Sequence, residues 1–140
     1  MTAQLAAALA AEHAAIYAYG LIGVRLDGAA AEQARSAEAA HRARRDQLVV
    51  LLTDRGASPP PPEPAYAVPF AVTDRASALR LAIEVEERAG AVWRAALAAT
   101  TGTQRNQALA ALTDTAVRAT RWRRIAGVTP VTVPFPGRTG

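Results

Sequence analysis

The chain of 140 residues contains no cysteine and no lysine. The absence of cysteine excludes disulfides and thiolate metal sites, and it is compatible with a reducing cytoplasm. Aromatic residues are also scarce, at 5%, although 51% of the residues are hydrophobic. The core must therefore be built from alanine, leucine, valine and isoleucine. Because alanine is the strongest helix former, this composition and length predict an all-α fold in one domain.

The sequence also lacks a long uninterrupted hydrophobic run. Glu12 and His13 interrupt the apolar start of the chain, and the run that follows spans only residues 14–24. A helix that spans a bilayer needs about 20 apolar residues, and a secretory signal begins with a basic segment that is missing here. We therefore expect a soluble, cytoplasmic protein with no membrane partner.

All 16 basic residues are arginines, and the net charge is +4. The stretch RATRWRR, residues 118–124, places four of them around a tryptophan, which suits phosphate neutralisation and base stacking. The same run is typical of a solvated helix end, where the negative C-terminal end of the helix dipole stabilises cations. We prefer the second interpretation, so nucleic acid is not an expected partner.

Four helical segments are predicted. They run from Thr2 to Asp27, from Ala30 to Asp54, from Asp74 to just before Gly102, and from Thr103 to Ala126. Thr2 and Thr73 are candidate N-caps, and Gly127 ends the fourth segment. The sequence after it, VTPVTVPFPGRTG, contains three prolines and should form no helix. We expect a bundle over residues 1–127 and a non-helical tail over residues 128–140, which packs on the bundle or on a second copy.

The connections between the segments differ in length. The first and the last are short, which makes the joined helices antiparallel neighbours. Between the second and third segments, residues 56–73 read GASPPPPEPAYAVPFAVT. Prolines extend such a segment by about 3.1 Å per residue, so it can run the length of a 25-residue helix. A crossover of this kind makes helices two and three parallel, as in ferritin-like bundles, whereas a flexible tether is the alternative.

Three segments place acidic residues on their apolar faces. At about 100° per residue, Glu12 shares a face with the leucines of the first segment and Glu86 with those of the third. Glu38 and His41 share the apolar face of the second segment, and their spacing allows both to hold one metal ion. Because buried carboxylates are costly without a cation, we expect these four side chains to converge inside the bundle around a metal or an arginine.

The metal hypothesis rests on a known pattern. Di-iron carboxylate bundles use a Glu from each of two helices and Glu-x-x-His from each of the other two. Glu12, Glu38, His41 and Glu86 match four of these positions, but the fourth segment offers only Asp114, which lies opposite its apolar face. This partial set suits one iron, manganese or zinc ion with water, or no metal.

Arginine is the alternative partner for these carboxylates. Arg45 lies one turn past His41 on the same face, and Arg118 or Arg121 can reach inward from the fourth segment. Such a network would form charge-assisted hydrogen bonds of about 2.7–2.9 Å. His13, about 100° from the inward face, is expected to be an ordinary edge residue.

Several stretches together resemble a known family. EHAAIYAYG (12–20), HRARRDQL (41–48), PAYAVPFAVTDRASAL (64–79), VWRAAL (92–97) and RWRR (121–124) are similar to an actinobacterial ferritin-like domain family of unknown function. The resemblance covers the chain except its tail and implies a ferritin-like four-helix bundle. It also implies that Glu12, Glu38, His41 and Glu86 match the ligand positions of the wider superfamily. It brings no established activity, and the missing ligand pair in the fourth segment departs from the iron-oxidising pattern.

Two functions follow as hypotheses. The first is a ferritin-like protein that binds iron or another divalent metal through the partial carboxylate and histidine site. The second is a metal-free bundle that forms a homodimer or binds a protein partner, with arginine and carboxylate side chains in place of the metal. The sequence shows no nucleophile with a base, no glycine-rich phosphate loop and no dinucleotide fingerprint, so no enzyme class is assigned.

Overall fold

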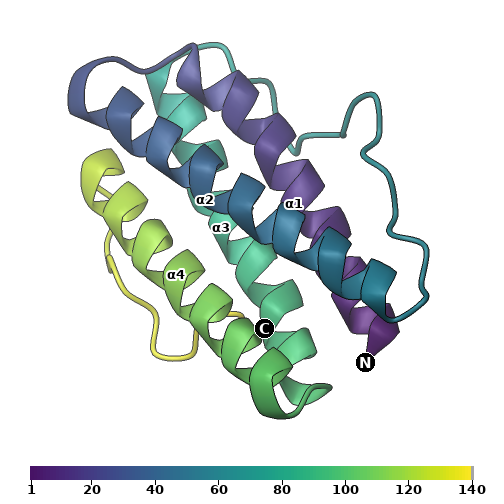
Figure 1. The fold of residues 1–140 in the computed structure, drawn as a ribbon. Helices are drawn as coiled ribbons and strands as arrows, with labels where there is room; N and C mark the ends of the chain where they lie inside the picture. Colours follow the sequence, from purple (N-terminus) through teal and green to yellow (C-terminus); the bar gives the residue numbers. More distant parts are fainter. Residues whose placement is uncertain (140) are drawn as a thin grey trace.

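The computed structural model describes residues 1–139, which contain four α-helices and no strand. The helices are α1 (Thr2–Gly23), α2 (Gly28–Asp54), α3 (Arg75–Ala98) and α4 (Gly102–Ala126). They pack side by side in one bundle (Figure 1). The predicted all-α four-helix fold is confirmed.

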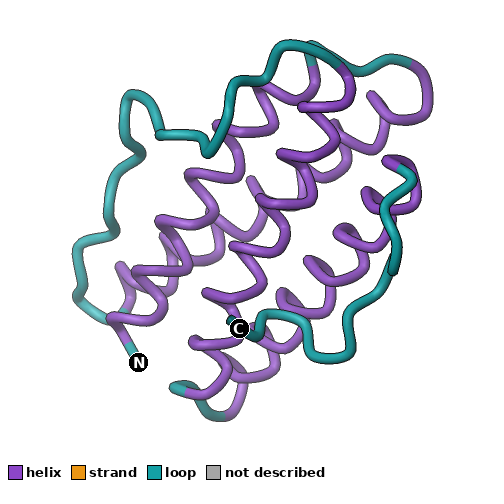
Figure 2. The backbone as a smooth tube through the Cα atoms, turned by 180° about the vertical axis from the view of Figure 1, so that it is seen from behind, coloured by secondary structure: helices purple, strands orange, loops and turns teal. Residues whose placement is uncertain are grey.

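The helices form two antiparallel hairpins. α1 pairs with α2 and α3 pairs with α4, while α1 also packs on α3 and the contact between α2 and α4 is the weakest (Figure 1). Residues 55–74 run from the end of α2 back along the bundle to the start of α3 (Figure 2). α2 and α3 are therefore parallel, as predicted, and the connectivity is that found in ferritin-like bundles.

The crossover is docked on the bundle and is not a free tether. Val68, Phe70 and Val72 pack against the apolar core. The ring of Tyr66 lies 5.6 Å from the ring of Tyr17 on α1, measured between centroids. The segment therefore covers the face that α1 and α3 share.

The boundary between α1 and α2 differs from the prediction. α1 ends at Gly23 and not at Asp27, because Asp27 has extended backbone and is the N-cap of α2. α2 consequently begins earlier than predicted, at Gly28. At the start of α1, the N-cap is Met1, and Thr2 is already helical.

α3 begins with a capping box. The N-cap is Asp74 and not Thr73, since the Asp74 carboxylate accepts a 2.8 Å hydrogen bond from the backbone N–H of Ser77. The Ser77 hydroxyl accepts the backbone N–H of Asp74 in return, at 3.1 Å. At the end of α4, Gly127 has the left-handed φ of 71° that the sequence predicts for a glycine stop.

A polar layer divides the apolar core into two clusters. One cluster contains Tyr19 and Trp122, and the other contains Trp93 together with leucines of α1 and α2. Between them, α1, α2 and α3 each direct one titratable side chain toward the centre of the bundle. These side chains are Glu12, His41 and Glu86.

α1 is long and apolar enough to span a membrane by length and composition, although it contains Glu12 and His13. Half of its most apolar 18-residue stretch is buried inside the protein, which is also a property of core helices in soluble proteins. A cytoplasmic location stays a prediction.

Candidate functional site

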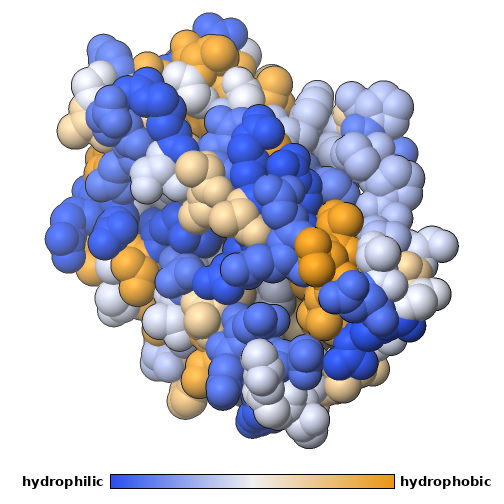
Figure 3. All heavy atoms as spheres, in the orientation of Figure 1, coloured by the Kyte–Doolittle hydropathy of each residue, from blue (hydrophilic) through white to orange (hydrophobic). Residues whose placement is uncertain are grey.

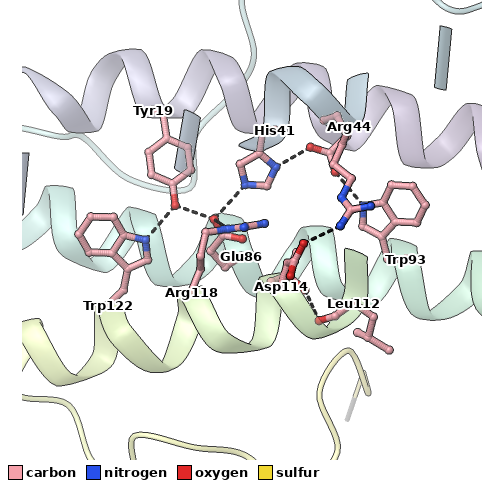
Figure 4. A network of polar contacts seen from close by, with 11 residues as sticks. Tyr19, His41, Arg44, Glu86, Trp93, Leu112, Asp114, Arg118 and Trp122 are labelled. Atoms are coloured by element: carbon pink, nitrogen blue, oxygen red, sulfur yellow. Dashed lines mark hydrogen bonds and ion pairs between the residues drawn. The ribbon is translucent and has the colours of Figure 1, made fainter. Parts of the chain in front are cut away.

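Three of the four predicted site residues meet at the centre of the bundle. Glu12, His41 and Glu86 are at most 1% exposed. Nδ1 of His41 lies 2.5 Å from Oε2 of Glu12, and its Nε2 lies 2.9 Å from Oε1 of Glu86 (Figure 4). One imidazole from α2 therefore bridges a carboxylate of α1 and a carboxylate of α3.

The fourth predicted residue, Glu38, lies outside this group. Its carboxylate accepts a 2.9 Å hydrogen bond from Arg42, and its side chain is 28% exposed. The prediction that Glu38 faces the interior is wrong, because α2 buries a narrow face formed by Ala34, Ala37 and His41. Glu38 lies about 100° from Ala37 around the helix and therefore at the edge of that face, where its side chain reaches the solvent.

A cation from α4 joins the network. Nε of Arg118 donates a hydrogen bond of 3.1 Å to Oε1 of Glu86 (Figure 4), and the Arg118 side chain is only 14% exposed. An inward arginine from α4 was one of the predicted alternatives to a metal. The distance is slightly longer than the predicted range.

The other two candidate arginines do not reach the interior. Arg45 pairs with its neighbour Asp46 at 2.9 Å, and Arg121 is exposed. The prediction for Arg45 is wrong because Leu48 takes the next buried position of α2 after His41.

Three aromatic side chains complete the hydrogen bonds of the buried network, and their role was not predicted from the sequence. Nε1 of Trp93 donates to Oε1 of Glu12 at 2.7 Å, and the Tyr19 hydroxyl donates to Oε1 of Glu86 at 2.7 Å. Nε1 of Trp122 donates to the Tyr19 hydroxyl at 2.9 Å. A signal existed, since Tyr19 and Trp93 lie two helical turns after Glu12 and Glu86, and buried Tyr and Trp need polar partners.

The charges in this network balance. Burial lowers the pKa of His41, but the hydrogen bonds with Glu12 and Glu86 outweigh burial and raise this pKa to about 9. Burial raises the pKa of Glu86, yet the hydrogen bond and charge of His41, helped by Arg118, bring it below its usual value. Burial and the Glu86 charge raise the pKa of Tyr19 well above its usual value, so its hydroxyl remains a donor. Glu86 therefore faces two cations at neutral pH, the His41 imidazolium and the Arg118 guanidinium.

One atom of the network is unsatisfied. Oε2 of Glu86 is buried and has no hydrogen-bond partner within residues 1–139. Such an oxygen carries a desolvation cost that a further donor or cation would offset.

The donor types suit iron, manganese or zinc, but their arrangement does not fit a metal ion. Both ring nitrogens of His41 already face carboxylates, and the Arg118 guanidinium adds positive charge beside Glu86. Over residues 1–139, no group of three or more His, Cys, Asp or Glu side chains is placed to hold a metal. A metal would require the loss of a proton from His41 and the withdrawal of Arg118.

Two further residues singled out in the sequence lie elsewhere. His13 is buried beneath the crossover, where its Nε2 lies 3.1 Å from the carbonyl oxygen of Pro60. It therefore holds the crossover in place. Asp114 forms a 2.5 Å ion pair with Arg44 of α2 at the surface, away from the network centre.

The sequence profile described as a domain of unknown function, DUF4439, matches residues 4–140. The chain belongs to this family. The match includes the tail, which the resemblance found in the sequence leaves out. A crystal structure of a conserved hypothetical protein from Mycobacterium tuberculosis is also similar, with 40% identity and a TM-score of 0.87. The similarity covers 96% of this chain and 95% of the mycobacterial chain. No curated protein matches the chain.

Proposed function

We propose that this protein is a ferritin-like bundle that works without a resident metal, as a module for self-association or for binding a protein partner. The two hairpins, the long crossover and the buried carboxylates of α1 and α3 support the ferritin-like assignment. One observation carries the metal-free part of the proposal: each ring nitrogen of His41 faces a carboxylate oxygen within 2.9 Å.

His41 and Arg118 take over the role that a metal cation has in a ferritin-like centre. They neutralise Glu12 and Glu86, which would otherwise be buried without compensation. Trp93 and Trp122 extend the hydrogen bonds, so that every helix contributes at least one side chain. The network supports a structural role, in which it fixes the register of the four helices.

α4 offers a surface for association. It packs mainly on α3, and its Leu109 is 52% exposed. The face formed by α2 and α4 is largely hydrophilic, with separate apolar patches (Figure 3). Small apolar patches among charged side chains support a reversible contact, such as a homodimer, over an obligate interface.

The second candidate function is the binding of iron, manganese or zinc. The unpartnered Oε2 of Glu86 favours it, because a buried carboxylate oxygen is a suitable metal ligand. In this candidate, His41 and Glu86 would exchange their mutual hydrogen bond for the metal. Glu38 would take no part, since it lies at the surface with Arg42.

Elemental analysis of protein purified without chelators separates the two candidates. The metal-free proposal predicts far less than one metal ion per chain and no rise in melting temperature on adding iron, manganese or zinc. One ion per chain that is lost in His41→Ala and kept in Glu38→Ala would instead establish the metal candidate. Glu38→Ala is the matched control because it removes a surface carboxylate.

Sedimentation equilibrium tests the self-association. A dimer of the wild type that dissociates in Leu109→Glu would support the α4 surface. Val50→Glu is the control, since Val50 lies on α2, is 60% exposed and should leave the dimer intact. A wild type that stays monomeric at all concentrations would contradict self-association.

A further inference from the structure

The tail forms a strap over α3 and α4, with a groove beneath it. This tail strap, residues 128–139, leaves the end of α4 and returns along these helices (Figure 2). The groove has a volume of about 690 Å³ and is lined by α3, α4 and the tail strap. This volume lies within the range of roughly 300–1,000 Å³ that small-molecule sites have.

Two arginines hold the tail strap at separate points. Nη1 of Arg123 donates a 3.2 Å hydrogen bond to the carbonyl oxygen of Val131. Nη1 of Arg94 donates a 2.9 Å hydrogen bond to the carbonyl oxygen of Pro136. The backbone between these anchors does not fill the space beneath it, and this space is the groove.

A contact between two glycines reinforces the second anchor. A Cβ atom on Gly137 would lie 2.6 Å from the carbonyl oxygen of Gly90, and Gly137 has a φ of 76°. A side chain at this position would therefore push the tail strap away from α3. Val133 and Phe135 remain 43% and 58% exposed although the tail strap is docked. A ligand in the groove would cover part of this apolar surface.

The walls of the groove are mainly apolar. They include Leu112, Ala116, Val117 and Ala119 of α4 with Val133 and Phe135 of the tail strap. Four threonines also line the groove: Thr113, Thr115, Thr120 and Thr132. The hydroxyls of the three on α4 already donate to α4 carbonyls, Thr113 to Leu109 at 2.9 Å, Thr115 to Leu112 at 2.8 Å and Thr120 to Ala116 at 3.0 Å. The groove is therefore suited to an apolar chain.

Arginines give the groove a positive edge. Arg123 is paired with Glu87 at 2.6 Å. Arg121 and Arg124 also line the groove and are exposed, and neither forms an ion pair with a carboxylate among residues 1–139. Two uncompensated guanidinium groups beside an apolar groove are complementary to an acid group at the end of an apolar chain.

We infer that this groove binds a small amphipathic anion. Its apolar chain lies between α4 and the tail strap, and its acid group contacts Arg121 and Arg124. A fatty-acid-like carboxylate is the simplest member of this ligand class. This inference goes beyond the proposed function. The groove reaches the buried network at Glu86, whose charge is compensated by His41 and Arg118.

Isothermal titration calorimetry with octanoate and octanol tests the charged edge. The two probes share the same chain and differ in the acid group. The wild type should bind one octanoate, more tightly than octanol. The double variant Arg121→Gln/Arg124→Gln should weaken octanoate binding by about tenfold, because two charge-assisted contacts are lost, and should leave octanol binding unchanged. Arg42→Gln/Arg55→Gln removes the same charge from α2 and its C-cap and should change neither affinity.

A second variant tests the apolar groove. Ala116→Phe should abolish the binding of both probes, with circular dichroism to check that the helices are retained. If Ala116→Phe does not fold, the surface variant Arg121→Gln/Arg124→Gln still decides the question. Octanoate binding that is absent in the wild type, or unchanged in the double arginine variant, would overturn the inference. A wild-type dimer that covers the groove and excludes octanoate would overturn it as well.

Discussion

Arg118 of α4 donates a 3.1 Å hydrogen bond from Nε to Oε1 of Glu86 on α3. The same oxygen accepts the Tyr19 hydroxyl and faces Nε2 of His41. One carboxylate oxygen therefore connects side chains from all four helices. The stability of the bundle should depend strongly on the groups that neutralise it.

Replacing Arg118 with methionine should lower the free energy of unfolding by about 2–3 kcal/mol, because a buried carboxylate loses part of its compensation. Urea denaturation measures this loss. Arg44→Met is the matched control, since Arg44 also forms an ion pair between two helices, α2 and α4, but its partner Asp114 is 49% exposed. The control should lose less than about 1 kcal/mol. Equal losses in the two variants would show that Glu86 does not need Arg118.

The pKa of about 9 for His41 predicts that stability falls as the pH rises from 6.5 to 9. The fold favours the protonated imidazole, so the full contribution is present below pH 6.5 and is lost as the pH passes 9. The shift corresponds to about 3 kcal/mol. The lowered pKa of Glu86 affects stability at acidic pH, since the contribution of Glu86 to stability is lost only as the pH falls below 4.5.

Thermal unfolding between pH 6 and pH 10 measures this dependence. In His41→Gln the decline should disappear, because glutamine does not titrate. This variant should also be less stable than the wild type at neutral pH, since the buried carboxylates lose a cation. A wild-type melting temperature that stays constant over this range would contradict a charged His41.

Tyr19→Phe should lower the free energy of unfolding by about 2 kcal/mol, because it removes the acceptor of Trp122 and a donor to Glu86 in a buried site. Urea denaturation followed by far-ultraviolet circular dichroism measures the change. Tyr17→Phe is the control, since the Tyr17 hydroxyl forms no hydrogen bond within residues 1–139 and its ring packs on Tyr66. A loss in the control as large as in Tyr19→Phe would count against the role of the hydroxyl.

Gly137→Ala should release the tail strap, because the added Cβ would lie 2.6 Å from the Gly90 carbonyl oxygen. We expect faster trypsin cleavage after Arg138 than in the wild type. Gly20→Ala is the control, since a Cβ there meets nothing within 4 Å and α1 should gain about 0.5–1 kcal/mol of stability. Unchanged cleavage in Gly137→Ala would show that the glycine contact does not hold the tail strap.

The helices and their order follow from the amino-acid sequence alone. Apolar periodicity marks the four segments. Gly127 ends the last helix and the prolines of residues 56–73 prevent a helix there, both through local backbone geometry. The lengths of the connections then decide which helices are antiparallel neighbours. The burial of Glu12 and Glu86 was also predictable, because each lies at the centre of an apolar stripe on its own helix.

Which side chains meet depends on how the helices pack against one another. Glu38 and Arg45 lie near the buried face of α2, yet both find partners at the surface, whereas His41 points to the centre. Arg118, and not Arg45, reaches Glu86. Helical phase fixes the direction of a side chain only to within several tens of degrees. The depth at which it is buried and the partner that it finds depend on how closely the neighbouring helices approach, and no single helix encodes that distance.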